Sequence, residues 1–299
     1  MPEEREAQEV AGRDQVLSVW QVVERSRHPD RPYALDYIRR LAPDFIELHG
    51  DRNAGDDPAL VAGLGTWHGQ TVCFLGNQKG RSLPERVARN WGMMHPEGYR
   101  KAMRMARMAT KFGFPIVALV DTPGAYPGAA AEERGIAIAI GEAIMGWFEV
   151  PVPFVAAIIG EGGSGGALGI AVADRVLMME NSIYSVASPE AAASIVWRDN
   201  GRKVEAAEQL QITSRDLHAM GVVEDVIAEP PGGAHTDPAA AAALLGDCVW
   251  RHLEPLLDEP AAALLQRRFD RFRYIDSLVA AAPDFGPKVG EGGSRRGIA

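Results

Sequence analysis

Uninterrupted apolar runs alternate along this chain with segments of helical periodicity. The β-type runs in its first half are residues 60–64, 72–75, 115–120 and 152–159. The helical segments begin at Pro96, span 129–147 and resume at Gly165. Strands that are apolar throughout are typical of a sheet buried on both faces. The pattern therefore predicts an α/β fold with helices covering both faces of a central sheet.

The second half continues this alternation and then becomes helical. It contains β-type runs at 175–179, 182–185 and 222–227 and helical runs at 205–210, 214–220, 237–257 and 261–274. Ser188 followed by Pro189 predicts a capped helix start. No repeat of fixed period and no central linker appears. The predicted divisions are an N-terminal polar, partly helical extension (1–30), a core (31–230), C-terminal helices (231–285) and a flexible tail (286–299).

Composition narrows the class of protein. The 299 residues carry 31 Lys and Arg against 40 Asp and Glu, a net charge of −9, and 46% of them are hydrophobic. An acidic globular chain of this kind argues against a general nucleic-acid or anionic-membrane binder. With no apolar signal segment or span, we expect a cytoplasmic protein without a membrane partner.

Cysteine and histidine spacing gives no sign of a metal site. The two cysteines, Cys73 and Cys248, form neither a disulfide framework nor a CxxC pair. The histidines at 28, 49, 68, 95 and 218 make no HxxxH or HExxH pattern. We therefore expect no metal in this chain.

The most unusual segment is residues 160–167, Gly-Glu-Gly-Gly-Ser-Gly-Gly-Ala, between an apolar run and a small-residue helix. Glycines leave backbone N–H groups uncovered, and the helix that follows adds its positive end. Such a turn favours binding of an anion. The alternative is a strand–helix crossover that needs glycine only for close packing.

A second strand exit, residues 120–128, has similar Pro and Gly punctuation. Loops that follow neighbouring parallel strands face one crevice. If the amides of Gly124 or Ala125 meet those of Gly165 or Gly166, they form donors for a developing oxyanion. Two unrelated turns are the alternative interpretation.

The glycine-rich segment also matches a hydrolase pattern. Residues 162–166 fit G-x-S-x-G, the nucleophile elbow, with Ser164 as the nucleophile. A triad would then need Asp225 followed by His235 or His252. This serine hydrolase is the remote alternative.

Positive charge concentrates between residues 79 and 111. Lys79 and Arg81 flank Gly80 after a β-type run, and the helix from Pro96 carries basic residues along one face. In an acidic chain this favours a phosphate-bearing ligand or an acidic partner. A solvated helix face is the alternative.

Taken together, these segments resemble the α subunits of the bacterial acetyl-CoA carboxylase carboxyltransferase. The resemblance runs in family order from about residue 20 to about residue 275. The matching blocks are residues 31–38, 49–52, 78–81, 96–102, 121–128, 132–135, 160–167, 184–190 and 232–235. It implies a crotonase-type (ClpP/crotonase-like) fold, a spiral of ββα units, with a helical C-terminal extension.

The resemblance also implies a shared reaction. A β subunit with a four-cysteine zinc ribbon completes an α2β2 assembly, which moves a carboxyl group from carboxybiotin on the biotin carboxyl carrier protein to acetyl-CoA, giving malonyl-CoA. Two oxygens gain charge in that transfer, so two backbone oxyanion holes are needed. The implied catalytic amides are those of Gly165, Gly166, Gly124 and Ala125. The implied substrate-binding residues are Gly162, Gly163, Lys79, Arg81 and Tyr126.

The chain departs from the family pattern near these cations. Asn77 stands where the family has histidine, and residues 82–84 replace a more polar stretch. Contacts around Lys79 and Arg81 are therefore expected to differ. Two further functions stay open: a subunit of a related biotin-dependent acyl-CoA carboxylase or decarboxylase, and a non-catalytic scaffold.

Overall fold

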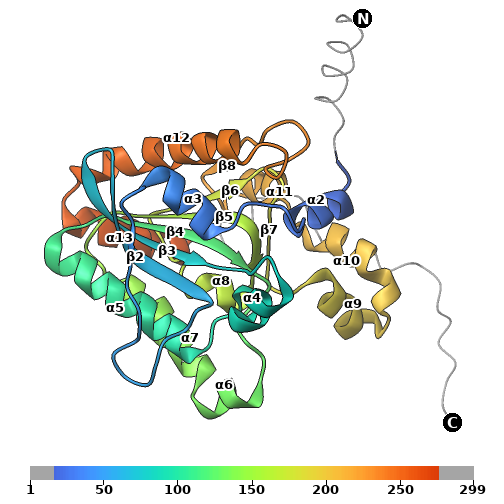
Figure 1. Cartoon of the computed structure of the whole chain (residues 1–299). Coiled ribbons are helices and arrows are strands. Elements are labelled where there is room, and N and C mark those ends of the chain that lie inside the picture. The colour runs from blue at the N-terminus through green and yellow to red at the C-terminus, as the bar shows by residue number, and fades with distance from the viewer. Residues whose placement is uncertain (1–16, 276–299) are drawn as a thin grey trace, which may run out of the picture.

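A mixed β-sheet lies between two layers of helices in the computed structural model, which describes residues 17–275 (Figure 1). Its described strands are β1 (Ile46–Glu47), β2 (Leu60–Trp67), β3 (Gln70–Asn77), β4 (Ile116–Thr122), β5 (Phe154–Gly163), β6 (Arg175–Met179), β7 (Ile183–Ser185) and β8 (Asp225–Ile227). They are ordered β1-β2-β3-β4-β5-β6-β8, and β7 also pairs with β5. The β1–β2 and β2–β3 pairs are antiparallel, and all other pairs are parallel.

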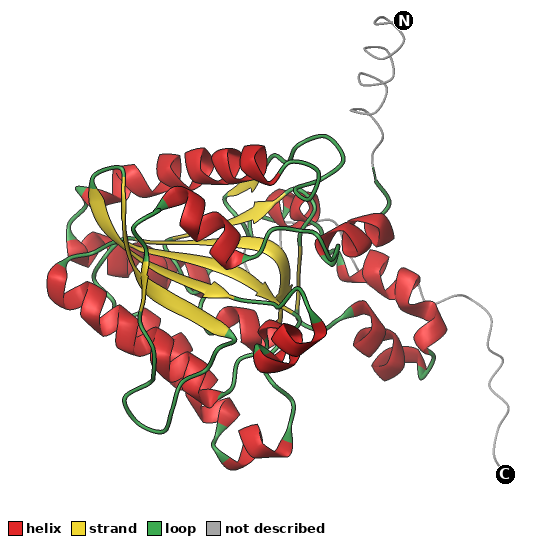
Figure 2. Cartoon of the chain, viewed as in Figure 1, coloured by secondary structure: helices red, strands yellow, loops and turns green. Residues whose placement is uncertain are grey.

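Helices cover both faces of this sheet (Figure 2). The described α-helices are α2 (Val19–Ser26), α3 (Ala34–Leu41), α4 (Leu83–Ala88), α5 (Pro96–Phe112), α6 (Ala129–Glu133), α7 (Ile136–Trp147), α8 (Ser164–Leu168), α9 (Pro189–Trp197), α10 (Lys203–Leu210), α11 (Ser214–Ala219), α12 (Pro238–Leu257) and α13 (Ala261–Arg273). Helices α3 and α12 pack on one face, and α5 and α7 lie on the other. Helices α2, α9 and α10 group together beyond β7 (Figure 1).

The central strands explain why both faces are covered. In β4, Ile116, Ala118 and Val120 point into one core, and Val117 and Leu119 point into the other, all fully buried. Strand β5 alternates in the same way. Side chains on both sides of each strand are apolar, so the sheet needs helices on both faces. This confirms the predicted architecture.

The β2–β3 hairpin closes through a tight two-residue turn. His68 and Gly69 both have positive φ, 48° and 74°, and Trp67 pairs with Gln70. Two central residues of positive φ match the twist of the flanking strands. The predicted helix start is also confirmed, because the Ser188 hydroxyl accepts a hydrogen bond from the Ala191 N–H at 3.1 Å.

One predicted helix is divided in the structure. The segment 129–147 forms α6 and α7, separated by Gly135 with φ of 77°. A left-handed residue cannot continue a right-handed helix, so the chain turns there. Helices α3 and α4 are additions to the prediction.

The C-terminal helices pack directly on the sheet layers. Arg268 of α13 is fully buried, donating to the Asp174 carboxylate and to the backbone carbonyls of Trp147, Val150 and Val152. Within residues 17–275, no helix is long and apolar enough to cross a membrane. The predicted tail and most of the predicted N-terminal extension lie outside the described residues.

Candidate active site

Two loops that leave neighbouring strands meet in backbone contact. A Cβ atom built on Gly166 would lie 2.3 Å from the carbonyl carbon of Gly124, and one on Gly163 would lie 2.1 Å from the Pro123 carbonyl oxygen. The backbone of residues 123–125 therefore occupies the space that side chains at these glycines would need. The loops after β4 and β5 therefore pack directly against each other.

The glycine-rich turn presents backbone amides without a side-chain cap. Helix α8 begins at Ser164, and its N-cap residue, Gly163, supplies no side chain. Gly165 and Gly166 are the second and third residues of the helix, where N–H groups have no partner within a helix. Ser164 adopts a φ of 49° at the entry, which turns the chain sharply from strand to helix.

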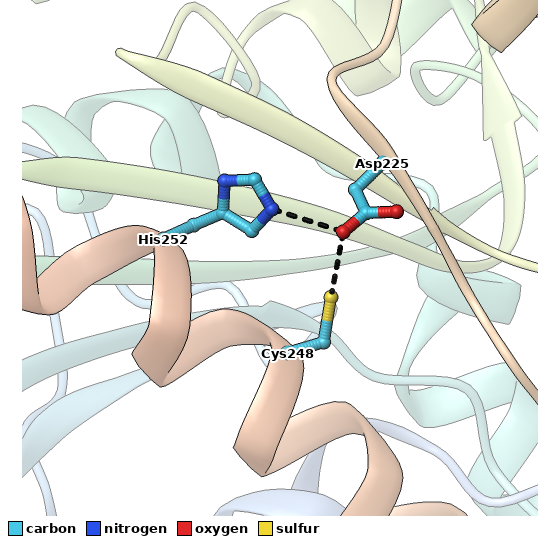
Figure 3. A group of neighbouring side chains, drawn as sticks. All are labelled: Asp225, Cys248 and His252. Carbon is cyan, nitrogen blue, oxygen red and sulfur yellow. Dashed lines mark hydrogen bonds and ion pairs between the residues drawn. The ribbon is translucent and has the colours of Figure 1, made fainter.

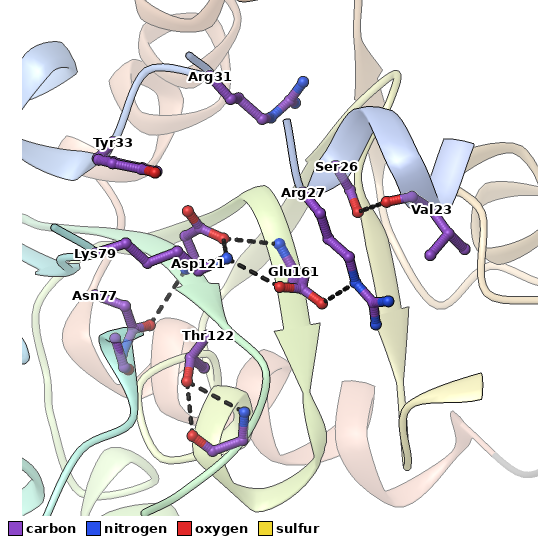
Figure 4. Close-up of polar contacts among 12 residues, drawn as sticks. Val23, Ser26, Arg27, Arg31, Tyr33, Asn77, Lys79, Asp121, Thr122 and Glu161 are labelled. Carbon is purple, nitrogen blue, oxygen red and sulfur yellow. Dashed lines mark hydrogen bonds and ion pairs between the residues drawn. The ribbon is translucent and has the colours of Figure 1, made fainter. Parts of the chain in front are cut away.

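The amides of the opposite loop differ in availability. The Gly124 N–H donates to the Thr122 hydroxyl at 3.2 Å, and that hydroxyl donates to the Gly124 carbonyl at 2.6 Å (Figure 4). The Gly124 amide is thus already engaged in holding its own turn. Among the described residues, the Ala125 N–H has no protein acceptor. Of the amides predicted in this loop, Ala125 is the one free to meet a ligand.

A buried charge cluster lies at the ends of the parallel neighbours β3, β4 and β5 (Figure 4). Lys79 Nζ lies 2.7 Å from Asp121 Oδ1 and 2.9 Å from Glu161 Oε2. The Glu161 N–H also donates to Asp121 Oδ1 at 2.9 Å. The three side chains are 13%, 2% and 10% exposed. The cluster therefore fixes three strand ends relative to one another.

Further contacts connect this cluster to the surrounding elements. Arg27, which ends α2, donates to Glu161 at 2.7 Å and to Glu190 of α9 at 2.8 Å. Asn77 accepts from the Asp121 N–H and donates to the Gly92 carbonyl, both at 3.3 Å. Asn77, which departs from the family pattern, is thus hydrogen-bonded on both sides.

Electrostatics decides the charge state of the cluster. Burial by itself would lower the pKa of Lys79, but Asp121 and Glu161 outweigh it and raise that pKa. Burial likewise raises the Glu161 pKa, yet Lys79 and Arg27 bring it down to about 2. Burial raises the pKa of Asp121, so this carboxylate takes up a proton before Glu161 does. Lys79 is therefore a permanent cation near neutral pH and not a general base.

The other predicted binding residues lie around this centre. Arg81 pairs with Asp36 at 2.5 Å, and its guanidinium lies 4.7 Å from the Tyr33 ring centroid. Tyr126 directly follows the Ala125 turn, with its ring centroid 4.1 Å from that of His95. Arg81 is about half exposed, so it remains accessible at the rim.

An apolar cavity of about 380 Å³ opens beside the glycine-rich turn. Ser164 and Gly165 line one side of it, and Leu168, Tyr184, Val186 and Phe272 are among its other lining residues. Gly162 packs against the Tyr184 ring, because a Cβ there would lie 2.8 Å from the Tyr184 Cδ2 atom. Volume and lining are those of a small-molecule pocket with one polar edge.

Comparisons with known proteins identify the family of this chain. The profile of the family described as "Acetyl co-enzyme A carboxylase carboxyltransferase-like" matches residues 3–276. The chain belongs to this carboxyltransferase family. An acetyl-coenzyme A carboxylase carboxyl transferase subunit alpha from Synechococcus elongatus is 50% identical over 266 residues, covering 89% of this chain and 81% of the relative. The corresponding subunit of Deinococcus radiodurans is 53% identical over 262 residues, covering 88% and 83%.

Solved structures establish the fold of this carboxyltransferase-family chain. A Pseudomonas malonate decarboxylase hetero-tetramer in complex with coenzyme A matches with a TM-score of 0.64 and 18% identity, covering 83% of this chain and 98% of that one. Transcarboxylase 12S matches with a TM-score of 0.58 and 23% identity, covering 78% and 44%. The predicted crotonase-type α/β fold is confirmed.

The structure separates the proposed hydrolase residues of this carboxyltransferase-family chain. Asp225 does contact His252, at 3.1 Å. However, Asp225 lies on β8, two strands away from β5, and its register connects it through Leu177 of β6 to Ala157 of β5. Ala157 precedes Ser164 by seven residues along the chain. His235 instead stacks on His28, with ring centroids 3.7 Å apart. The residues proposed for a triad thus do not surround Ser164.

Sequence reasoning missed most of the charge cluster. Asp121 and Glu161 each belong to a segment marked by its glycines, but the sequence pattern predicts no role for either carboxylate. A signal was available in the sequence: two successive apolar strands each end in a single carboxylate, and a lysine follows the strand before them. Arg27 gave no signal, because it comes from a helix more than a hundred residues earlier in the chain than Glu161.

Proposed function

We propose that this chain is the alpha subunit of an acetyl-CoA carboxylase carboxyltransferase, which transfers the carboxyl group of carboxybiotin to acetyl-CoA and forms malonyl-CoA. The observation that carries the proposal is the contact between the two strand-end turns, where Gly163 and Gly166 meet the backbone of residues 123–125. The names of relatives about 50% identical support the same function.

The turns supply what the reaction requires of this chain. Carboxybiotin provides an activated carboxyl group, and its ureido oxygen gains negative charge as that group leaves. The amides of Gly165 and Gly166 donate hydrogen bonds to this oxygen, with the Ala125 amide on the opposite side of the crevice. A donor already in place for developing charge contributes about 3–4 kcal/mol to the barrier reduction.

The buried cluster keeps these amides in place. Lys79 holds the two carboxylates of β4 and β5, and the Glu161 N–H bond to Asp121 joins the two strands just before the glycine-rich turn. These are positioning residues, because Lys79 is only 13% exposed and contacts both carboxylates. Arg81 and Tyr126, nearer the surface, are available to contact the biotinyl arm or its carrier.

The cavity beside Gly165 suits a compact apolar ring system. Its lining is mostly apolar, and its volume of about 380 Å³ lies in the range of small-ligand pockets. A ring held there excludes water from the turn, and hydrogen bonds to a developing oxyanion are stronger in a dry site.

We further propose that a second subunit covers this side of the molecule. Val186 lines the cavity and is 75% exposed, and Ile195 and Val196 of α9 are also exposed. A group of exposed apolar side chains beside a site is typical of an interaction surface. The partner is the zinc-ribbon β subunit, in an α2β2 assembly that supplies the acetyl-CoA side of the site.

The remaining components follow from the proposed reaction. The biotin carboxyl carrier protein delivers the carboxybiotin, and the product enters fatty acid synthesis as its first committed intermediate. The assembly works in the cytoplasm.

The test is the reverse reaction, malonyl-CoA-dependent carboxylation of free biotin. It is measured for this chain alone, for the β subunit alone and for their purified complex. Activity in the complex only is the predicted result. A well-formed complex that carboxylates biotin from another carboxylated acyl-CoA but not from malonyl-CoA would make the chain part of a related carboxylase. A complex that is inactive with every donor would favour the alternative function, a non-catalytic scaffold.

A further inference from the structure

A group of three potential metal ligands lies between β8 and α12 (Figure 3). Helix α12 packs on the face of the sheet opposite to that of α8. Cys248 and His252 are one helical turn apart on α12, and Asp225 begins β8. Asp225 Oδ2 lies 3.1 Å from His252 Nε2 and 3.7 Å from Cys248 Sγ. The three ligand atoms all lie within 4.8 Å of one another.

We propose that Asp225, Cys248 and His252 form a binding site for one Zn²⁺ ion. A thiolate, an imidazole and a carboxylate are the ligand types that zinc takes in proteins. Spacing of i and i+4 places the first two on one face of α12, directed at the same strand. This site is independent of the proposed carboxyl transfer.

The geometry is close to what a tetrahedral ion needs. Bonds of about 2.3 Å to sulfur and about 2.1 Å to nitrogen and oxygen give ligand separations of about 3.4 Å for nitrogen to oxygen and about 3.6 Å for sulfur to oxygen. The observed separations are 3.1 and 3.7 Å. The sulfur-to-nitrogen separation, at most 4.8 Å now, would need to contract to about 3.6 Å. Side-chain rotation alone can supply such a change.

The site is also accessible to an ion. The side chains of His252 and Asp225 are 20% and 32% exposed, whereas Cys248 is buried at the base. The Arg251 guanidinium now lies 2.8 Å from Asp225 Oδ2 and 3.3 Å from Cys248 Sγ. Because the Arg251 side chain is 66% exposed, it can move into solvent at little cost and leave the fourth position to water.

Arg251 makes the proposal sharply testable, since it competes with the metal for the same atoms. Removing this cation strengthens zinc binding if the three residues are a metal site. If they are only an ion-pair network that joins α12 to β8, removing Arg251 merely loosens the contact. The two interpretations thus predict different results for Zn²⁺ binding when Arg251 is replaced.

The experiment measures Zn²⁺ binding to the full chain after treatment with a chelator, by competition with a chromogenic chelator. Wild-type protein is expected to bind one ion with a Kd below about 1 μM. Replacing a ligand costs more than the 10–100-fold typical of outer-shell contacts, so Cys248→Ser and His252→Ala should each weaken binding by more than about 100-fold. Arg251→Gln should bind more tightly than wild type. Cys73→Ala, at the other cysteine, is the matched control and should bind as wild type does.

Cobalt substitution identifies the ligands directly. Co²⁺ in the wild-type site should show intense tetrahedral d–d bands and a sulfur-to-cobalt charge-transfer band, and the latter should vanish in Cys248→Ser. Binding that survives Cys248→Ser would belong to surface groups such as His49 and Asp56, which lie 2.9 Å apart, and would overturn the proposal. Absence of tight binding in both wild type and Arg251→Gln would overturn it as well. Because the two ligand variants are independent, failure of one to fold leaves the other as the test.

Discussion

One added methyl group should destabilise the fold at Gly166 and leave its stability almost unchanged at the adjacent Gly165, both in the proposed oxyanion turn. In Gly166→Ala, the new Cβ would lie 2.3, 2.6 and 2.7 Å from three backbone atoms of residues 124 and 125. These atoms cannot rotate away, so the turns must separate by about 1 Å, at a cost of about 1–3 kcal/mol. In Gly165→Ala, the nearest atom is Cγ2 of Ile140 at 3.4 Å, an ordinary contact, and stability should stay within about 0.5 kcal/mol of wild type.

Activity should follow the same division. Separating the turns displaces the Ala125 and Gly166 amides, and loss of one oxyanion donor typically lowers kcat by about 100-fold or more. Gly166→Ala should therefore lose at least that much, whereas Gly165→Ala should keep most of its activity. The assays are urea unfolding of the chain and biotin carboxylation by its complex with the β subunit.

A third glycine provides the control for these variants. Among the described residues, no atom lies within 4 Å of the place that a Cβ on Gly141 of α7 would take. Gly141→Ala should therefore gain about 0.5–1 kcal/mol of stability and leave activity unchanged. Transfer within twofold of wild type in a folded Gly166→Ala complex would refute the assignment of this turn to catalysis.

Three further changes test other parts of the structure. Lys79→Met leaves the buried Asp121 carboxylate without its cation, whereas Glu161 keeps Arg27, and should lower the free energy of unfolding by about 3–5 kcal/mol in urea titrations; a loss below about 1 kcal/mol would contradict the buried cluster. Burial by itself would raise the pKa of Glu229, but Arg31 outweighs burial and lowers that pKa below 4.5. The ion pair therefore stabilises the fold above pH 4.5, and this stability is lost as the pH falls through the lowered pKa of Glu229 in the folded state. The stability gap between wild type and Arg31→Met should thus shrink below pH 4.5, and a gap that widens there would reverse the sign of the argument. Ser164→Ala should keep carboxyl transfer within about twofold, because a true nucleophile would cost orders of magnitude.

The strands could be predicted from the sequence because burial on both faces of the sheet favours apolar residues at successive positions in them. Residues such as Val117 and Ala118 are both fully buried, on opposite faces, and an uninterrupted apolar run is the direct signature of that burial. The break at Gly135 could not be predicted in the same way. A single glycine is tolerated inside many helices, and only its φ of 77° shows that the chain turns there.

The candidate site likewise has features that could be predicted from local sequence and features that could not. The glycine-rich turns were predictable, because few structures need five glycines in eight residues. The contacts of Lys79 and Gly124 could not be predicted, because they depend on partners brought close by the fold. Lys79 looked like a substrate ligand and is instead enclosed by two carboxylates, and the Gly124 amide is held by its neighbour Thr122. A local pattern can predict a ligand-binding turn, whereas long-range contacts decide which of its atoms are left without a partner.

The most direct test of the proposed site is a crystal structure of the complex with the β subunit and bound biotin. The account predicts that the ureido oxygen lies about 2.7–3.1 Å from the amide nitrogens of Gly165 and Gly166. The ring should then occupy the cavity beside Gly165. A biotin whose ureido oxygen contacts other donors, with the glycine-rich turn left in solvent, would contradict it.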